Sequence, residues 1–137
     1  MTFRCSDAFV TLAVADIETL VRFYTQLLNQ QPKSCIPNVY AEFQLPGLRL
    51  GLFKPKENHL VEFENSAHGG MSLCLEVEDL EEAITLTGFL RIAHLTSLGY
   101  PPPGKMITAS HGREIYAFDP ARNRLILHQS KSSTDNE

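Results

Sequence analysis

The sequence predicts an α+β fold of two tandem βαβββ modules, and three features of the chain lead to this prediction. A strand-like alternation runs directly into a helical repeat between Ala8 and Leu28. A similar stretch recurs at Ser72–Ile84. Short alternating segments bounded by turn residues follow both stretches, as expected for strands joined by hairpins.

The first stretch predicts a strand followed by a capped helix. Apolar residues alternate with others over Ala8–Val14, which is the period of a half-buried strand. Asp16 is the expected N-cap, because its carboxylate can accept the unpaired amide protons of the first helical turn. Asn29 follows the helical pattern and can adopt the left-handed conformation that ends many helices. The apolar stripe between them consists of Ile17, Leu20, Val21, Tyr24, Leu27 and Leu28.

The second stretch aligns with the first when Ser72 is placed on Phe9. The strand period, the aspartate at the helix start and the helical stripe then coincide. Four pairs are identical, namely Leu12 with Leu75, Val14 with Val77, Asp16 with Asp79, and Glu18 with Glu81. We interpret this correspondence as an internal duplication.

Three further strands complete the first half. They are expected at Gln31–Cys35, Asn38–Leu45 and Leu48–Phe53, with a turn at Pro46-Gly47. The polar segment 54–70 is the predicted linker. Both halves are expected in one domain spanning residues 1–137, with module 1 at about 8–53 and module 2 at about 71–129.

The second half follows the same plan with a longer helix. Asp79 and Glu82 resemble a capping box, and the helical pattern continues to Gly99 with a kink or break near Gly88. Strands are then predicted at Lys105–Ser110, Arg113–Phe118 and Arg124–Gln129, with a turn at Asp119–Asn123 between the last two. The polar tail 130–137 is expected to be disordered.

Composition excludes several classes of protein. The net charge is −4 and the pI is about 5.7, without a basic run, so a nucleic-acid surface is not expected. No apolar stretch is long enough to cross a bilayer, so we expect no membrane partner. The three cysteines, Cys5, Cys35 and Cys74, form no CxxC pair, which favours a reducing, cytoplasmic setting.

The order of short motifs resembles the vicinal oxygen chelate superfamily, which includes glyoxalase I, bleomycin-resistance proteins, extradiol dioxygenases and fosfomycin-resistance enzymes. The matching pieces are Val14-Ala15-Asp16, Phe23-Tyr24, Val77-Glu78-Asp79, Gly112-Arg113 and Asp119-Pro120. The resemblance spans roughly Ala8 to Gln129. It implies a curled mixed sheet around an open cleft with helices outside, and it is compatible with a homodimer.

The resemblance also implies where a metal would bind, and the ligands are missing there. Metal-dependent members carry His or Glu at positions that correspond to Phe9, Gly51, Ser72 and Ile126 of this chain. None of these side chains is an imidazole or a carboxylate, the usual ligands of such centres. Glu76 and His128 share the strand faces of Ser72 and Ile126. However, they lie at least two residues away, about 6.6 Å along a strand. We therefore expect no metal of the family type and no cofactor.

The cleft face is predicted from strand alternation. Its chemically mixed set is Phe9, Thr11, Arg49, Phe53, Ser72, Cys74, Glu76, Arg124, Ile126 and His128, with His111 on a turn near the cleft mouth. The opposite, helix-side set is wholly aliphatic and consists of Val10, Leu12, Val14, Leu73, Leu75, Val77, Leu125 and Leu127. A mixture of apolar and polar groups suits a small-molecule pocket. The alternatives without a role in ligand binding are that the arginines are solvated, Phe9 fills space, His111 is merely exposed, and Cys74 is a small buried hydrophobe.

Two classes of function follow. The first is a bleomycin-resistance-like protein that binds a small organic ligand without metal, where Arg49 and Arg124 would favour an anionic, partly aromatic compound. The second is a metal-dependent lyase, isomerase or dioxygenase with displaced ligands. A third, weaker possibility is a catalytically inactive subunit whose cleft mediates association. The missing ligands favour binding over catalysis, and no catalytic residue is assigned.

Overall fold

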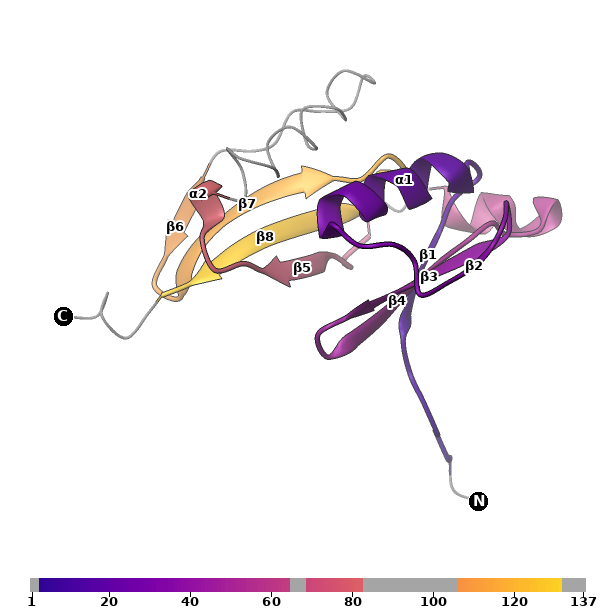
Figure 1. Ribbon diagram of the computed structural model, residues 1–137, viewed down its shortest axis with the longest axis horizontal. Helices are drawn as coiled ribbons and strands as arrows, with labels where there is room; N and C mark the ends of the chain where they lie inside the picture. Colours follow the sequence, from indigo (N-terminus) through magenta and orange to yellow (C-terminus); the bar gives the residue numbers. More distant parts are fainter. Residues whose placement is uncertain (1–2, 65–68, 83–105, 132–137) are drawn as a thin grey trace. The chain divides into compact units, whose positions relative to one another are not determined.

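The computed structural model of the chain describes residues 3–64, 69–82 and 106–131. It divides into two compact units, unit 1 at Met1–Glu64 and unit 2 at Asn65–Glu137 (Figure 1). Each unit contains one four-stranded mixed sheet and one helix of the predicted βαβββ pattern. The predicted α+β class with two modules is therefore confirmed.

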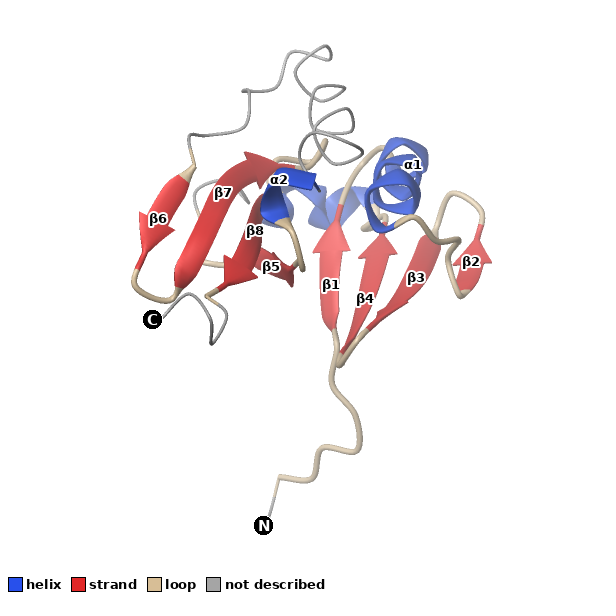
Figure 2. Ribbon diagram, turned by 60° about the vertical axis from the view of Figure 1, so that its left-hand side comes forward, coloured by secondary structure: helices blue, strands red, loops and turns tan. Residues whose placement is uncertain are grey.

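Unit 1 contains the strands and helices predicted for the first half, with an added 3₁₀ helix. Its elements are β1 (Val10–Ala13), α1 (Ile17–Leu28), β2 (Ser34–Ile36), β3 (Tyr40–Leu45), β4 (Leu48–Phe53) and the 3₁₀ helix η1 (Glu57–Phe63). Figure 2 shows its four strands side by side in the order β1, β4, β3, β2. Strand β1 pairs with β4 in parallel, and the other neighbours are antiparallel. η1 lies within the segment that the sequence analysis assigned to the linker.

Helix α1 begins and ends where its capping residues predict. The carboxylate of Asp16 accepts hydrogen bonds from the backbone N–H and the hydroxyl of Thr19. Asn29 adopts the left-handed conformation, with φ of 53°, and ends the helix. The predicted apolar stripe was wrong in one respect. Phe23, which it omitted, is buried, whereas Val21 is only half-buried at the edge of the packed face.

The core of unit 1 lies between α1 and one face of its sheet. Leu50 and Leu52 of β4 are fully buried, and the rings of Tyr24 and Phe43 meet with centroids 6.4 Å apart. The N-terminal segment before β1 extends away from this sheet, and Phe3 is almost fully exposed (Figure 1).

Unit 2 repeats this topology. Its described elements are β5 (Leu73–Glu76), α2 (Leu80–Glu82), β6 (Ile107–Ala109), β7 (Gly112–Phe118) and β8 (Arg124–Ser130), with sheet order β5, β8, β7, β6. At the start of α2, the N–H of Leu80 donates a hydrogen bond to Oε1 of Gln129. The rest of the predicted helix to Gly99 and its kink fall outside the described residues, as do residues 132–137 of the predicted tail. Ser130, assigned to that tail, ends β8.

The strand registers support the duplication. Thr11 pairs with Gly51 across β1 and β4, and Cys74 pairs with Ile126 across β5 and β8. Thr11 and Cys74 are equivalent in the sequence alignment of the two halves, so the two parallel strand pairs correspond. The predicted strand boundaries differ from the observed ones by one to three residues where a strand borders a turn. For example, β2 begins at Ser34, whereas the predicted strand begins at Gln31.

The turn between β7 and β8 is built around Asp119. This carboxylate is fully buried and accepts hydrogen bonds from the N–H groups of Ala121 and Asn123 and from Nδ2 of Asn123. The shorter turn between β3 and β4 uses Gly47 at a φ of 72°, which only glycine adopts without cost. No helix within the described residues has the length and apolar character needed to cross a membrane.

Candidate ligand-binding faces

Each sheet has one aliphatic face and one chemically mixed face. In unit 1 the aliphatic residues of β4 are buried beneath α1, whereas the alternate side chains project from the opposite face. We call these mixed surfaces the open face of unit 1 and the open face of unit 2. The first comprises Asp7, Phe9, Thr11, Tyr40, Glu42, Arg49, Gly51 and Phe53. The second comprises Ser72, Cys74, Glu76, Glu114, Tyr116, Arg124, Ile126 and His128, with His111 on the adjoining turn.

Arg49 is the centre of the open face of unit 1. Its guanidinium carbon lies 4.2 Å from the ring centroid of Phe9, which remains 44% exposed. Its Nη2 lies 2.5 Å from Oδ2 of Asp7, and its Nε lies 3.1 Å from Oε1 of Glu42 without hydrogen-bond geometry. The hydrogen bond between Arg49 and Asp7 lowers the pKa of Asp7 and raises the pKa of Arg49. Two carboxylates therefore already balance this cation.

The other predicted residues of this face lie beside Arg49 on neighbouring strands. Gly51 is covered by Tyr40, whose hydroxyl donates a hydrogen bond to Oε1 of Glu42 at 3.0 Å. Burial, followed by this hydrogen bond and the charge of Glu42, raises the pKa of Tyr40. Phe53 packs edge-to-face against Phe63 of η1, with ring centroids 5.5 Å apart.

His128 is the centre of the open face of unit 2. It is only 8% exposed, although it lies on the face that no described helix covers. Its Nδ1 lies 2.5 Å from Oε2 of Glu76, and the imidazole of His111 stacks on it with centroids 5.0 Å apart and planes 12° apart. Oε1 of Glu76 accepts a hydrogen bond from the N–H of Ser130. Desolvation raises the pKa of Glu76, but the hydrogen bonds from Ser130 and His128 outweigh it and leave the pKa below its ordinary value.

Tyrosine and glutamate form a matching pair on the third strand of each unit, which the sequence analysis missed. In unit 2 the hydroxyl of Tyr116 donates to Oε1 of Glu114 at 3.1 Å, as Tyr40 does to Glu42 in unit 1. The two residues occupy exchanged positions in the two modules. The predicted cleft set came only from the outer and last strands of each half, whereas these pairs lie on the third strand. The segments Tyr40-Ala41-Glu42 and Glu114-Ile115-Tyr116 were the available signal.

The remaining predicted residues of unit 2 are dispersed along β5 and β8. Arg124 lies over the ring of Phe118, 5.6 Å from its centroid, and makes no ion pair with any described residue. Ser72 precedes β5 and is exposed, and Ile126 is half-buried. The expectation that Cys74 is a small buried hydrophobe was wrong. Cys74 is exposed because it points to the side of the sheet opposite the aliphatic core.

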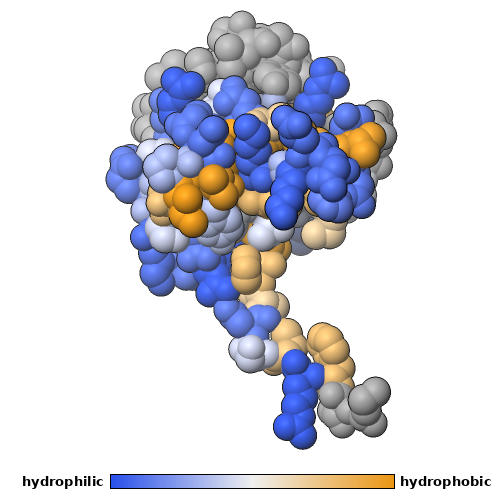
Figure 3. Space-filling model, turned by 90° about the vertical axis from the view of Figure 1, so that its right-hand side faces the viewer, coloured by the Kyte–Doolittle hydropathy of each residue, from blue (hydrophilic) through white to orange (hydrophobic). Residues whose placement is uncertain are grey.

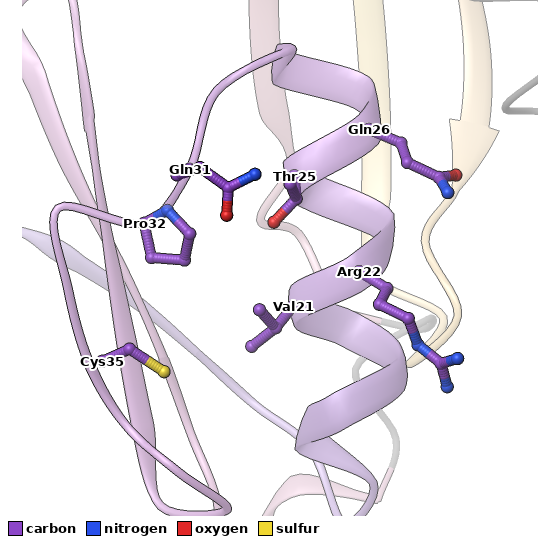
Figure 4. Close-up of a pocket in the computed structure, with 7 residues that line it drawn as sticks. All are labelled: Val21, Arg22, Thr25, Gln26, Gln31, Pro32 and Cys35. Atoms are coloured by element: carbon purple, nitrogen blue, oxygen red, sulfur yellow. The ribbon is translucent and has the colours of Figure 1, made fainter.

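A separate hollow lies on the helix side of unit 1. This cavity, of about 470 Å³, is lined by Val21, Arg22, Thr25, Gln26, Gln31, Pro32 and Cys35. Figure 4 shows Val21 and Thr25 of α1 facing Pro32 and Cys35, while Arg22 projects from another side of the helix. None of its residues was among the predicted ligand-binding set.

Searches by sequence found no relative, whereas comparison of structures did. No protein-family model matches the chain, and no curated protein matches its sequence. A glyoxalase-related enzyme from Fulvimarina pelagi has a TM-score of 0.67 at 19% identity, over 92% of this chain and 89% of that chain. A bleomycin-binding protein from Streptomyces verticillus, complexed with copper(II)-bleomycin, has a TM-score of 0.64 at 18% identity, over 95% and 100%.

A glyoxalase/bleomycin resistance protein from Catenulispora acidiphila is similar as well. It has a TM-score of 0.58 at 21% identity and covers 91% of this chain and 98% of that chain. The chain therefore has the fold of the glyoxalase and bleomycin-resistance proteins, as its resemblance to the vicinal oxygen chelate superfamily predicted.

Proposed function

We propose that the protein binds a small organic ligand on its open faces and does so without a metal at the family positions. The observation that carries this proposal is the contrast between the two faces of each sheet. One face is aliphatic and buried, while the other combines exposed aromatic rings with a few charged groups, such as Phe9 with Arg49 and Tyr116 with Glu114. Such a surface provides apolar area for affinity and polar groups for orientation.

Charge determines which part of the predicted anionic ligand each arginine can bind. Asp7 and Glu42 balance Arg49, so its guanidinium contributes mainly a stacking surface over Phe9. Arg124 has no ion pair among the described residues, and its fork of N–H donors suits a carboxylate. We therefore assign the acidic group of the ligand to Arg124.

Similarity to a bleomycin-binding protein, together with the missing ligands, supports a binding role. The Streptomyces verticillus protein is a bleomycin-binding protein, and its fold is the fold of this chain. Phe9, Gly51, Ser72 and Ile126 offer no imidazole or carboxylate for a metal of the family type. A metal-dependent enzyme with displaced ligands is the second candidate, because His111, Glu114 and His128 gather on one face.

The test is calorimetric titration of the metal-free protein, in the presence of a chelator, with aromatic carboxylates and with metal-free bleomycin. Wild type should bind one of these probes, and Arg124→Ala should weaken binding of a carboxylate about tenfold, equivalent to roughly 1.4 kcal/mol. Arg22→Ala, which removes an exposed arginine of α1, is the matched control and should leave affinity unchanged. Absence of binding to every probe would contradict the proposal. An effect confined to Arg22→Ala would move the site to the cavity beside α1.

We further propose that the protein acts as a homodimer in the cytoplasm. Strand β2 is an edge strand and presents Ile36, which is 58% exposed, next to the exposed Val39. On the face in Figure 3, hydrophobic side chains occur as small patches among hydrophilic ones. The free cysteines support a reducing compartment. Analytical ultracentrifugation should find a dimer that Ile36→Lys weakens, and a monomer at all concentrations would refute this arrangement.

A further inference from the structure

We propose that His111, Glu114 and His128 bind one divalent transition-metal ion, away from the four positions that correspond to family-type ligands. Each of the three side chains offers one ligand atom, and these atoms all lie within 4.8 Å of one another. They come from β7, β8 and the turn between β6 and β7, all within unit 2. This inference does not depend on the proposed ligand binding.

His128 provides the fixed point of the site. Its Nε2 is buried and has no hydrogen-bond partner in the described part of the chain, which is a costly state for a polar atom. When Nδ1 donates its proton to Glu76, Nε2 of the neutral ring retains a lone pair for a metal. A carboxylate that holds the remote nitrogen is the usual support of a metal-binding histidine. Glu76 is therefore a positioning residue.

Glu114 lies directly opposite His128 in the register of β7 and β8. The hydroxyl of Tyr116 donates to its Oε1, which restrains the carboxylate. Oε2 accepts no hydrogen bond from a described residue, so it is available as an oxygen ligand.

His111 supplies the adjustable ligand. Its backbone is held, because its carbonyl oxygen accepts a hydrogen bond from the N–H of Lys131 at 3.0 Å. Its side chain is exposed and stacks nearly parallel to the ring of His128. With metal–nitrogen distances of about 2.0–2.1 Å, two ligand atoms around a tetrahedral ion lie about 3.3–3.4 Å apart. The ring of His111 must therefore rotate out of the stack when the metal binds.

The donor set indicates which ions fit. Two imidazole nitrogens and one carboxylate oxygen suit Zn²⁺ and its neighbours in the first transition series, whereas Mg²⁺ and Ca²⁺ prefer oxygen alone. Three protein ligands leave at least one coordination position for water or another molecule.

The test is titration of the full-length, tag-free chain with Zn²⁺ by calorimetry and with Co²⁺ by visible absorption. Wild type should bind one ion per chain with micromolar or tighter affinity. His111→Gln and Glu114→Gln should each weaken Zn²⁺ binding at least tenfold and alter the Co²⁺ spectrum. Glu76→Gln should weaken binding by about 10–100-fold at unchanged stoichiometry. His59→Gln is the matched control, because it removes an exposed histidine as His111→Gln does, but one that lies outside the proposed site and is paired with Glu62.

Three results would overturn the site. The first is that wild type binds no Zn²⁺ at a concentration of about 100 µM, far above the expected dissociation constant. The second is that His111→Gln and Glu114→Gln both bind Zn²⁺ with wild-type affinity. The third is that His59→Gln weakens Zn²⁺ binding as much as they do. His128 is not varied, because it is buried. If Glu114→Gln does not fold, His111→Gln alone decides the question, since its side chain is exposed.

Discussion

A Cβ atom added at Gly51 would lie 2.8 Å from the hydroxyl oxygen of Tyr40. Gly51 is the position at which the family pattern places a metal-binding side chain in the first module. The ring of Tyr40 covers that position and is held there by its hydrogen bond to Glu42. At Gly51 the chain thus has neither a ligand side chain nor room for one.

The contact predicts that Gly51→Ala destabilises the protein through Tyr40. The new methyl group would displace the tyrosine ring and break its hydrogen bond, which should cost about 1 kcal/mol of unfolding free energy. In a Tyr40→Ala background the same substitution should be neutral or stabilising, because alanine restricts the unfolded chain. Urea denaturation of the four proteins measures the coupling. Gly70→Ala is the control, since a Cβ at Gly70 would meet no described residue within 4 Å beyond its chain neighbours. Additive effects of Gly51→Ala and Tyr40→Ala would contradict the explanation.

Asp119 should be among the most important polar residues for stability. Its truncation in Asp119→Ala leaves three hydrogen-bond donors of the turn without their acceptor, so we expect a loss of about 2–4 kcal/mol. Asp119→Asn keeps an acceptor oxygen and should cost less. Thermal and urea unfolding provide the measurement, with Glu78→Ala as an exposed control. Equal stability of Asp119→Ala and Glu78→Ala would show that the turn is not held by this carboxylate.

Most of the fold could be predicted from local sequence. Asp16, Asn29 and the Pro46-Gly47 turn each act through their own backbone neighbourhood, so their roles follow from residue type. The duplication then predicted that the two modules correspond strand for strand. Thr11 with Gly51 and Cys74 with Ile126 confirm that prediction.

The arrangement of the open faces could be predicted only in part. Strand alternation assigned Arg49 and His128 to the face opposite the aliphatic core, but it could not identify their partners. Asp7 precedes β1 and reaches Arg49 across 42 positions, and Glu76 reaches His128 across 52. Such contacts depend on rotamers and on strand twist, which residue pattern does not determine. Strand alternation placed Cys74 on the mixed face, and its exposure contradicts the alternative that it is a small buried hydrophobe.

The N-cap of α1 should make a pH-dependent contribution to stability. Hydrogen bonds from the side chain and backbone of Thr19 lower the pKa of Asp16 below its ordinary value of 3.8. A lowered pKa means that the folded state favours the carboxylate. Its stabilisation is therefore complete above about pH 4 and is lost as the pH falls through the folded pKa.

At pH 7, Asp16→Ala should cost about 1 kcal/mol of unfolding free energy, and the difference from wild type should shrink toward pH 3. Asp16→Asn retains a capping oxygen and serves as the control. It should stay close to wild type at pH 7. A pH-independent difference between wild type and Asp16→Ala would mean that the ionised form is not the one that caps the helix.

The ion pair between Asp7 and Arg49 predicts how the open face of unit 1 can be made to attract anions. Asp7→Asn removes the carboxylate that accepts the charge-assisted hydrogen bond and leaves the guanidinium over the ring of Phe9. Because an exposed ion pair contributes little, the affinity for an aromatic carboxylate should rise by only about two- to fivefold. Arg49→Ala should abolish this gain when it is combined with Asp7→Asn.

Asp16→Asn makes the same charge change at α1 in the same unit, so it separates a local effect from a change in net charge. Calorimetric titration at low ionic strength gives the affinities. A gain in Asp16→Asn equal to that in Asp7→Asn would assign the effect to net charge and leave Arg49 without a part in binding.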